Sequence, residues 1–522
     1  MAVPAYTTDL TTNNIFLDGS TTWTLIGGGR VTDVETDDYI QGSSCWSHDP
    51  FSSGIEGGVW NSSQTITSGN VVLFWLKCDV VATLATRAAG GMQAVIGSSA
   101  TAYKCWYVRG SDDYAAGGWV NVAIDPTVTA STTVGSPTST TAWFGARWNV
   151  PSTGASKGYP MKVDAMRQGR GQLLINGGQA GSLATFAGAA AANDASSAKW
   201  GLFEAQEGGA AGYRWKGLMS FGPTSLTEFT DANVNIFIEN TPYVGASFNR
   251  IEFNNASSII NWTNISITAL GTTSKGQLEM INNCTFNDTD GVFTDMDTFI
   301  YQSNGTVTGK TYRRCGQVTQ GGATFTDCLF TNSTAAVALL VDDLSLVTGC
   351  RFVSSGTGHA VNLGTVSATT AMSWSNTESG YAIQSGTAAN RTILVNVASG
   401  QTLTINVGTG ASTPTYYNTG TGTVTVVASF DHVLEGLELN TEVTYVTAGT
   451  ATELFHVEEA TTSDGSGKYK TTYSHGGGAS VDILIHHVNY LPDISNIYGL
   501  TLPSANTTVK IQMFEDVNYH NP

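Results

Sequence analysis

The segments Phe325-Thr-Asp-Cys-Leu-Phe330 and Val347-Thr-Gly-Cys-Arg-Phe352 share one short pattern, in which an apolar residue precedes a small apolar residue and then an aromatic one. Further copies are Phe248-Asn-Arg-Ile-Glu-Phe253, Ile281-Asn-Asn-Cys-Thr-Phe286 and a looser Thr369-Thr-Ala-Met-Ser-Trp374. The final aromatics are separated by 33, 44, 22 and 22 residues, all multiples of eleven. A repeat near 22 residues is typical of one coil of a right-handed parallel β-helix, with three short strands and their turns.

The spacing inside each copy supports this interpretation. The small apolar residue and the aromatic are two positions apart, so on a strand both side chains point to the same face. We expect them to pack inside the coil against their equivalents one coil away, with Asn, Thr, Gly and Asp in the turns. Because 33 does not correspond to whole coils, we expect an irregular or inserted coil near Trp262–Ile267. The predicted β-helix domain spans residues 223–410.

The composition is that of an all-β protein. Charged residues make up 12% of the 522 residues, about half the roughly 25% of typical soluble domains, and there are 59 glycines. A hydrophobic fraction of 41% with 12 tryptophans argues against disorder, because such a chain can bury enough apolar surface to offset its ordering entropy. The net charge of −18 argues against a nucleic-acid partner, since phosphate binding requires a basic patch.

The regions on either side of the predicted β-helix differ from it. Ten of the twelve tryptophans precede residue 220, among strand-like runs such as Val71–Leu76 that are separated by glycine-rich turns. Residues 1–222 are therefore predicted to form a β-sandwich or jelly roll, with one helical interruption in the alanine-rich segment 187–198. Alternating runs such as Thr441–Val446 predict a small β-sandwich over residues 411–522.

Sequence features that direct export or membrane insertion are not expected in this chain. The N-terminus has neither a basic region nor an apolar core typical of a signal peptide, and the longest apolar runs are far below the roughly 18 residues of a membrane helix. The seven cysteines are odd in number and contain no CxxC motif, so we expect reduced thiols packed as small hydrophobic residues. Synthesis in a reducing cytoplasm without insertion into a membrane is predicted.

The C-terminal region resembles a module found at the C-terminus of many tailed-phage virion proteins. The residues that carry the resemblance are Tyr469-Lys-Thr-Thr-Tyr473, Val481-Asp-Ile-Leu-Ile-His486, Gly499-Leu-Thr-Leu502 and the ending Phe514–Pro522. The ending departs from the family at Val517, where the family usually carries Arg. The resemblance implies a structural role on a virion, as a tail fibre, tailspike or capsid-attached protein, and it transfers no catalytic residue.

An acidic cluster lies inside the predicted β-helix and consists of Asp288, Asp290, Asp295 and Asp297. Two such carboxylates across a groove could act as acid and nucleophile or base on a glycan, as in depolymerising tailspikes. Asp290 and the glycine after it could be half of a Ca²⁺ loop. A third interpretation is a solvated loop whose Asp residues form turns. The eight histidines show no ligand spacing, so no metal site is predicted from them.

Two aromatic pairs are candidate glycan-binding residues, namely Tyr114 with Trp119 and Tyr213 with Trp215. Flat apolar rings next to Asp or Asn suit sugar faces. The alternative is that these rings fill the core of the N-terminal domain.

Together these features predict a structural component of a tailed-phage virion that projects from tail or capsid and contacts host surface glycans. The expected partners are other virion proteins and host polysaccharide. A homotrimer is compatible with this role, although no coiled-coil heptads require it. Two alternatives stay open: a tailspike enzyme that cleaves host polysaccharide, and a capsid decoration protein without a receptor role.

Overall fold

The computed structural model describes residues 23–27, 33–40, 45–48, 54–61, 65–114, 118–151, 161–175, 184–193, 201–206, 211–223, 228–354, 356, 358–381, 391–408, 411–427, 430–475, 479–494, 496–503 and 506–516. The chain divides into two compact units, one of residues Met1–Thr285 with Asp295–Asp297 and one of residues Phe286–Thr294 with Thr298–Pro522. Strands dominate both units, which confirms the all-β class. None of the helices in the described part of the chain is long and apolar enough to cross a membrane.

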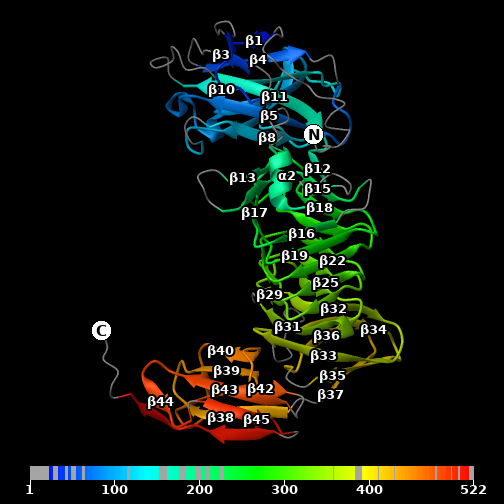
Figure 1. Ribbon diagram of the computed structural model, residues 1–522, viewed down its shortest axis with the longest axis vertical. Coiled ribbons are helices and arrows are strands. Elements are labelled where there is room, and N and C mark those ends of the chain that lie inside the picture. The colour runs from blue at the N-terminus through cyan, green and yellow to red at the C-terminus, as the bar shows by residue number, and fades with distance from the viewer. Residues whose placement is uncertain are drawn as a thin grey trace. The chain divides into compact units, whose positions relative to one another are not determined.

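The N-terminal part of the first unit contains two antiparallel sheets (Figure 1). One sheet has the order β1 (Thr24–Ile26), β4 (Gly54–Asn61), β10 (Trp143–Val150), β6 (Met92–Ser99), β7 (Ala102–Arg109) and β9 (Thr132–Val134). The other has the order β2 (Asp33–Glu35), β3 (Cys45–His48), β11 (Met161–Gly169), β5 (Val71–Cys78) and β8 (Val120–Ile124). Both sheets contribute side chains to one hydrophobic core, which includes Trp46, Phe74, Trp106 and Trp148.

The rest of the first unit is built mainly from parallel strands. One series is β12 (Gln172–Ile175), β15 (Leu218–Phe221), β18 (Arg250–Phe253) and β21 (Gln277–Met280). The others are β14 (Tyr213–Trp215), β17 (Asn235–Ile238) and β20 (Ser266–Ala269), and β16 (Glu228–Ala232) with β19 (Ile259–Thr263). A short antiparallel strand, β13 (Phe203–Ala205), pairs with β14. The helix α2 (Phe186–Asn193) begins one residue before the predicted helical segment 187–198 and overlaps it to Asn193, and residues 194–198 are outside the described residues.

The second unit begins with parallel strands, which form three series of paired neighbours. One series is β22 (Thr285–Thr289), β25 (Gly305–Thr308), β28 (Thr324–Thr326) and β31 (Val347–Val353). A second is β23 (Val292–Thr294), β26 (Thr311–Arg313), β29 (Leu329–Thr331), β31 and β33 (Thr370–Ser379), which β35 (Thr402–Val407) and β37 (Thr423–Val427) continue. A third is β24 (Thr298–Ile300), β27 (Gln317–Thr319), β30 (Val337–Leu340), β32 (His359–Val366), β34 (Ile393–Val397) and β36 (Tyr416–Asn418).

The register explains only part of the predicted 22-residue repeat. Phe330 pairs with Phe352, and their rings stack with centroids 4.9 Å apart, so this step is one of 22 residues. Phe253 lies on a different series of strands, where it pairs with Met280. Phe286 on β22 and Phe330 on β29 also belong to different series, so the interval of 44 does not correspond to two coils, and that part of the prediction is wrong.

The offset between paired parallel strands varies along the chain, from 18 residues between Val307 and Phe325 to 46 between Gln172 and Leu218. The segments between the strands absorb these length differences, and within the pairs the register shifts between Thr348 and Arg351 and between Asn362 and Thr365. The segment predicted to be irregular, Trp262–Ile267, contains the ends of two regularly paired strands. The series of parallel strands given above extend from Gln172 to Val427, beyond residues 223–410 at both ends.

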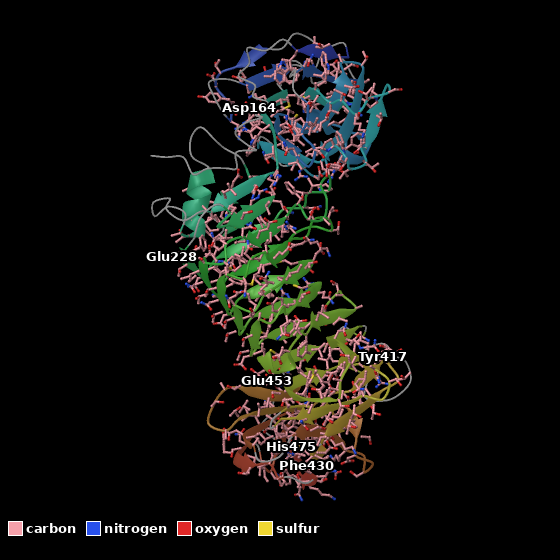
Figure 2. The ribbon with its side chains drawn as sticks, turned by 90° about the vertical axis from the view of Figure 1, so that its right-hand side faces the viewer. Asp164, Glu228, Tyr417, Phe430, Glu453 and His475 are labelled. Carbon is pink, nitrogen blue, oxygen red and sulfur yellow. The ribbon has the colours of Figure 1, made fainter. Side chains whose placement is uncertain are left out.

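The C-terminal part of the second unit has two four-stranded sheets around a core that includes Leu434, Tyr445 and Tyr473. One sheet has the order β41 (Thr462–Ser463), β42 (Tyr469–His475), β38 (Phe430–Leu437) and β46 (Thr507–Lys510). The other has the order β40 (Glu453–Val457), β39 (Glu442–Thr447), β43 (Ser480–His486) and β45 (Asn496–Thr501), and β44 (Tyr490–Pro492) pairs with β47 (Met513–Glu515). Phe430 and His475 are register partners on β38 and β42 (Figure 2). Val517 and the residues after it lie outside the described residues.

Candidate functional site

A cavity of about 580 Å³ lies in the first unit, between the ends of β7 and β8 and the strands β13, β14 and β17. Its lining combines aromatic side chains with charged ones. Trp75, Tyr114 and Trp119 supply rings, while Arg109, Arg214, Lys216 and Glu239 supply charges. Two of the predicted glycan-binding residues, Tyr114 and Trp119, thus line the same cavity.

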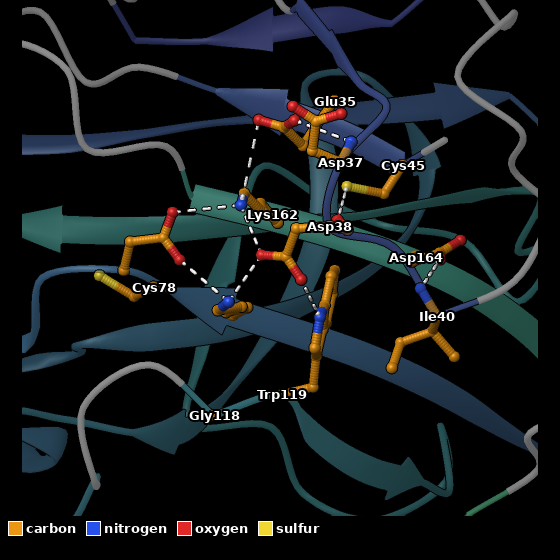
Figure 3. A network of polar contacts seen from close by, with 12 residues as sticks. Glu35, Asp37, Asp38, Ile40, Cys45, Cys78, Gly118, Trp119, Lys162 and Asp164 are labelled. Carbon is orange, nitrogen blue, oxygen red and sulfur yellow. Dashed lines mark hydrogen bonds and ion pairs between the residues drawn. The ribbon is translucent and has the colours of Figure 1, made fainter. Parts of the chain in front are cut away.

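An ionic network fixes the Trp119 indole (Figure 3). The Asp38 carboxylate accepts a hydrogen bond from Trp119 Nε1 at 2.9 Å through one oxygen. Its other oxygen accepts from the ammonium groups of Lys77 and Lys162, each at 2.6 Å. Asp79 forms further ion pairs with the same lysines, at 3.3 and 3.2 Å. The indole is therefore held at the cavity by a side chain that is itself fixed by two cations.

The pKa of Asp38 reflects this network. Partial burial acts to raise the pKa of the carboxyl, but the hydrogen bonds from Lys162, Lys77 and Trp119 outweigh it and lower the pKa to about 2. Asp38 is thus ionised across the physiological range, and the contact with the indole N–H persists there.

Tyr114 has a supporting position. Its hydroxyl donates to the backbone oxygen of Gly118 and accepts from the backbone N–H of Cys78 at 3.2 Å. Burial raises the pKa of this phenol to about 12. Because the hydroxyl already donates one hydrogen bond and accepts another, Tyr114 holds Gly118, directly before Trp119, in place rather than offering its hydroxyl to a ligand.

Glu239 is the centre of the charged wall. Its carboxylate pairs with Arg214 at 2.7 Å and with Lys216 at 2.8 Å, and Lys216 also donates to the backbone oxygen of Asn121 at 2.9 Å. Burial acts to raise the pKa of Glu239, but the charges of Lys216 and Arg214 lower it overall. The side-chain nitrogen and oxygen of Asn121 are buried with no hydrogen-bond partner among the described residues. This amide offers a donor and an acceptor to a polar ligand.

The second predicted pair, Tyr213 and Trp215, does not line the cavity. Trp215 is 1% exposed in the interior, and Tyr213 stacks on Phe203 with ring centroids 5.0 Å apart. Successive side chains on a strand point to opposite faces, so the neighbours Arg214 and Lys216 reach the cavity instead. That alternation in Tyr213-Arg-Trp-Lys216 is the signal that could have identified the two cations from sequence.

The predicted acidic cluster contains a buried ion pair. Asp288 is fully buried, and its carboxylate lies 2.6 Å from the equally buried Lys310 ammonium. Burial raises the pKa of Asp288 to about 6, against the opposing effect of Lys310. Lys310 also donates to the backbone oxygen of Asp290 at 2.7 Å and lies 4.2 Å from the centre of the Phe293 ring. A carboxylate enclosed in this way cannot contact an external glycan unless the ion pair opens.

The other members of the cluster lie at turns or at partly buried positions. Asp290 and Asp295 adopt left-handed backbone conformations with φ of 57° and 58°, as expected for Asp in turns. Burial raises the pKa of the half-buried Asp297. Asp295 and Asp297 belong to the first unit, whereas Asp288 and Asp290 belong to the second. The described residues contain no group of three or more His, Cys, Asp or Glu side chains placed to hold a metal ion.

Comparisons with known proteins give little information. No protein-family model and no curated protein matches the chain. Among solved structures, an arabinose-bound MgGH51 α-L-arabinofuranosidase is 10% identical with a TM-score of 0.21, over 30% of this chain and 26% of that chain. The CBM22-1 xylan-binding domain of Xyn10C from Paenibacillus barcinonensis is 13% identical with a TM-score of 0.19, over 30% of this chain and 90% of that domain. This chain thus spans about a quarter of the length of the arabinofuranosidase. At these TM-scores neither likeness supports an inference about fold or ligand.

Proposed function

We propose that the chain is a structural protein of a tailed-phage virion that binds host surface polysaccharide through the first-unit cavity. In this proposal the N-terminal sheets form a β-sandwich, the parallel strands form a right-handed β-helix, and the C-terminal sheets form a second small β-sandwich. The virion role rests on the resemblance of the C-terminal residues to tailed-phage modules. Several parallel series with offsets of one short coil support the β-helix.

The observation that carries glycan binding is the fixed Trp119 indole beside the polar wall of Arg214, Lys216 and Glu239. Sugars present apolar faces flanked by hydroxyls, so they are bound by a flat ring together with oriented donors and acceptors. Here the ring and the polar groups are held by ion pairs before any ligand arrives, which reduces the entropic cost of binding. A volume of about 580 Å³ is in the range of small-ligand sites, large enough for part of a chain of sugars.

Calorimetric titration of the purified chain with oligosaccharides from the host surface polysaccharide tests this site. Trp119→Ala removes the ring, and we expect affinity to fall about two- to tenfold, since ring stacking contributes about 0.5–1.5 kcal/mol. Tyr498→Ala, which removes a 69% exposed ring in the second unit, is the matched control and should leave affinity unchanged. Equal affinity of wild type and Trp119→Ala would exclude this cavity as the glycan site.

The virion role has its own test. A gold-labelled antibody against the chain, applied to intact particles and located by electron microscopy, should mark the tail or capsid surface. Unlabelled particles would contradict the proposal. Label on the capsid together with no glycan binding would favour the decoration protein, and new reducing or unsaturated ends in the polysaccharide would favour the enzyme.

A further inference from the structure

A second cavity, of about 390 Å³, lies in the N-terminal part of the first unit. Ile96 on β6 and Trp106 on β7 belong to both its lining and the core between the two sheets. Lys104 on β7 and segments before β5, after β8 and before β10 supply the rest of the lining, the segments at residues 66–70, 126–127, 137–139 and 141. None of the residues around the polar first-unit cavity takes part, so the two cavities are separate sites.

The charge of this lining is unlike that of the whole chain. The protein has 41 acidic and 23 basic residues, yet the described residues that line this cavity include Lys104 and no carboxylate. Among the described residues, no acidic side chain forms an ion pair with the Lys104 ammonium. The Asp125 carboxylate, next in sequence to the lining residue Pro126, accepts from the Thr127 hydroxyl at 2.6 Å and from the Thr127 backbone N–H at 2.8 Å. A cation without a counter-ion in an acidic protein indicates a site for an anion.

The Trp106 indole, which lines the cavity, is a second indication of an anion site. Trp106 is fully buried, and its indole Nε1 has no hydrogen-bond partner among the described residues. A buried N–H without an acceptor costs free energy that a bound acceptor would recover. Ile66, Ile96 and two prolines make much of the remaining lining apolar. The site therefore combines donors for a negative group with an apolar surface for the body that carries it.

We propose that this cavity binds a small organic carboxylate with an apolar or aromatic body. The carboxylate pairs with Lys104 and accepts a hydrogen bond from the Trp106 indole N–H, and the apolar body contacts Ile96. The ligand is distinct from a neutral polysaccharide, and this site does not depend on the proposed glycan site.

Calorimetry with three probes tests the proposal on the full chain: phenylacetate, its neutral amide phenylacetamide, and acetate. We expect phenylacetate to bind at least tenfold more tightly than either, because only it has both the charge and the ring. Lys104→Met should abolish the preference of the site for phenylacetate over phenylacetamide, with an unchanged melting temperature as evidence of folding. Lys275→Met, which removes a first-unit lysine outside this lining, is the matched control and should behave as wild type.

A second variant separates binding from folding. Trp106→Phe keeps an aromatic ring but removes the indole N–H, and we expect it to weaken phenylacetate binding about three- to tenfold. Absence of phenylacetate binding by the wild type at millimolar concentrations overturns the proposal. Equal binding of phenylacetate by the wild type and a folded Lys104→Met overturns it as well.

Discussion

The first unit and the second unit each contain a carboxylate paired with lysine, and the pKa values of these two carboxylates are shifted in opposite directions. Asp38, in the first unit, is 29% exposed and contacts two ammonium groups and an indole N–H, so its pKa falls to about 2. Asp288, in the second unit, is fully buried with one ammonium group 2.6 Å away, and its pKa rises to about 6. The Lys310 pKa is lowered by the same burial, which the charge of Asp288 opposes.

The difference shows that a lysine partner alone does not set the sign of a pKa shift. Removing a carboxylate from water disfavours its charge, and one cation at contact distance offsets only part of that cost. Two cations and a neutral donor at the protein surface more than offset a smaller cost. The first arrangement leaves the carboxylate available to hold Trp119 at a cavity, while the second is enclosed among parallel strands.

The largest expected effect comes from removing the cation of the buried pair. Lys310→Met leaves the Asp288 carboxylate buried without a counter-charge, and we expect the free energy of unfolding of the second unit to fall by about 3–5 kcal/mol. Urea denaturation at pH 7 measures this loss. The matched control is Lys468→Met, whose ammonium is 43% exposed beside Glu438 and whose loss should leave the free energy of unfolding nearly unchanged, because solvent screens an exposed ion pair.

The double variant Asp288→Leu/Lys310→Met sharpens the same comparison. With both charges replaced by apolar groups, most of the lost stability should return, because no charge is left in the interior. A single variant as stable as the wild type would show that the Asp288 carboxylate is not confined as the structure has it.

A smaller effect is expected from a buried titratable group with no ionic partner among the described residues. His432 is 2% exposed and its Nδ1 lies 2.8 Å from the Tyr445 hydroxyl. Burial, with the nearby His475 adding to it, lowers the His432 pKa from 6.5 to about 4. The unfolded chain therefore binds the proton more readily than the folded chain does. The contribution of the neutral His432 to the free energy of unfolding is complete above pH 6.5 and is lost as the pH falls towards 4.

We expect the wild type to lose about 2–3 kcal/mol from this histidine between pH 7 and pH 4, and His432→Gln to lack that loss. The measurement is the urea midpoint of the second unit across this pH range, compared between the two proteins so that the opposite effect of Asp288 cancels. His486→Gln, at a 70% exposed site, serves as control and should follow the wild type. Parallel pH curves for wild type and His432→Gln would contradict the assignment.

The sequence predicts the all-β class of the fold. Of the surroundings of Asp288, it predicts the burial of the carboxylate but not the lysine that pairs with it. Phe286 and Asp288 are two positions apart on β22 and both are buried, so strand alternation alone could have placed Asp288 in the interior. Its partner could not be found in this way, because Lys310 lies on a later segment and the offset between paired parallel strands ranges from 18 to 46 residues in this chain. The same limit applies to the cavity. The residues next to Trp119 in the sequence are enough to predict it as a ligand-binding residue. Arg214 and Glu239 come from segments about 100 residues away, whose positions depend on tertiary packing.

The smallest expected effect removes the carboxylate of the first-unit network. Asp38→Asn keeps the size of the side chain but leaves Lys77 and Lys162 with Asp79 and Glu35 as their acidic partners among the described residues. The loss of stability at pH 7 should be about 1 kcal/mol, because the carboxylate is partly exposed and its interactions are screened by solvent. Since the Asp38 pKa is lowered, this contribution is present above about pH 4 and is lost as the pH falls towards 2, so wild type and variant should converge at the acid end in thermal melts. The glycan affinities of wild type and Asp38→Asn should differ by a larger factor than their stabilities do, because an amide oxygen holds the Trp119 indole less firmly than a carboxylate does. A variant with unchanged stability and unchanged glycan affinity would mean that the network does not position the indole, and the contrast between the two units would then reduce to burial alone.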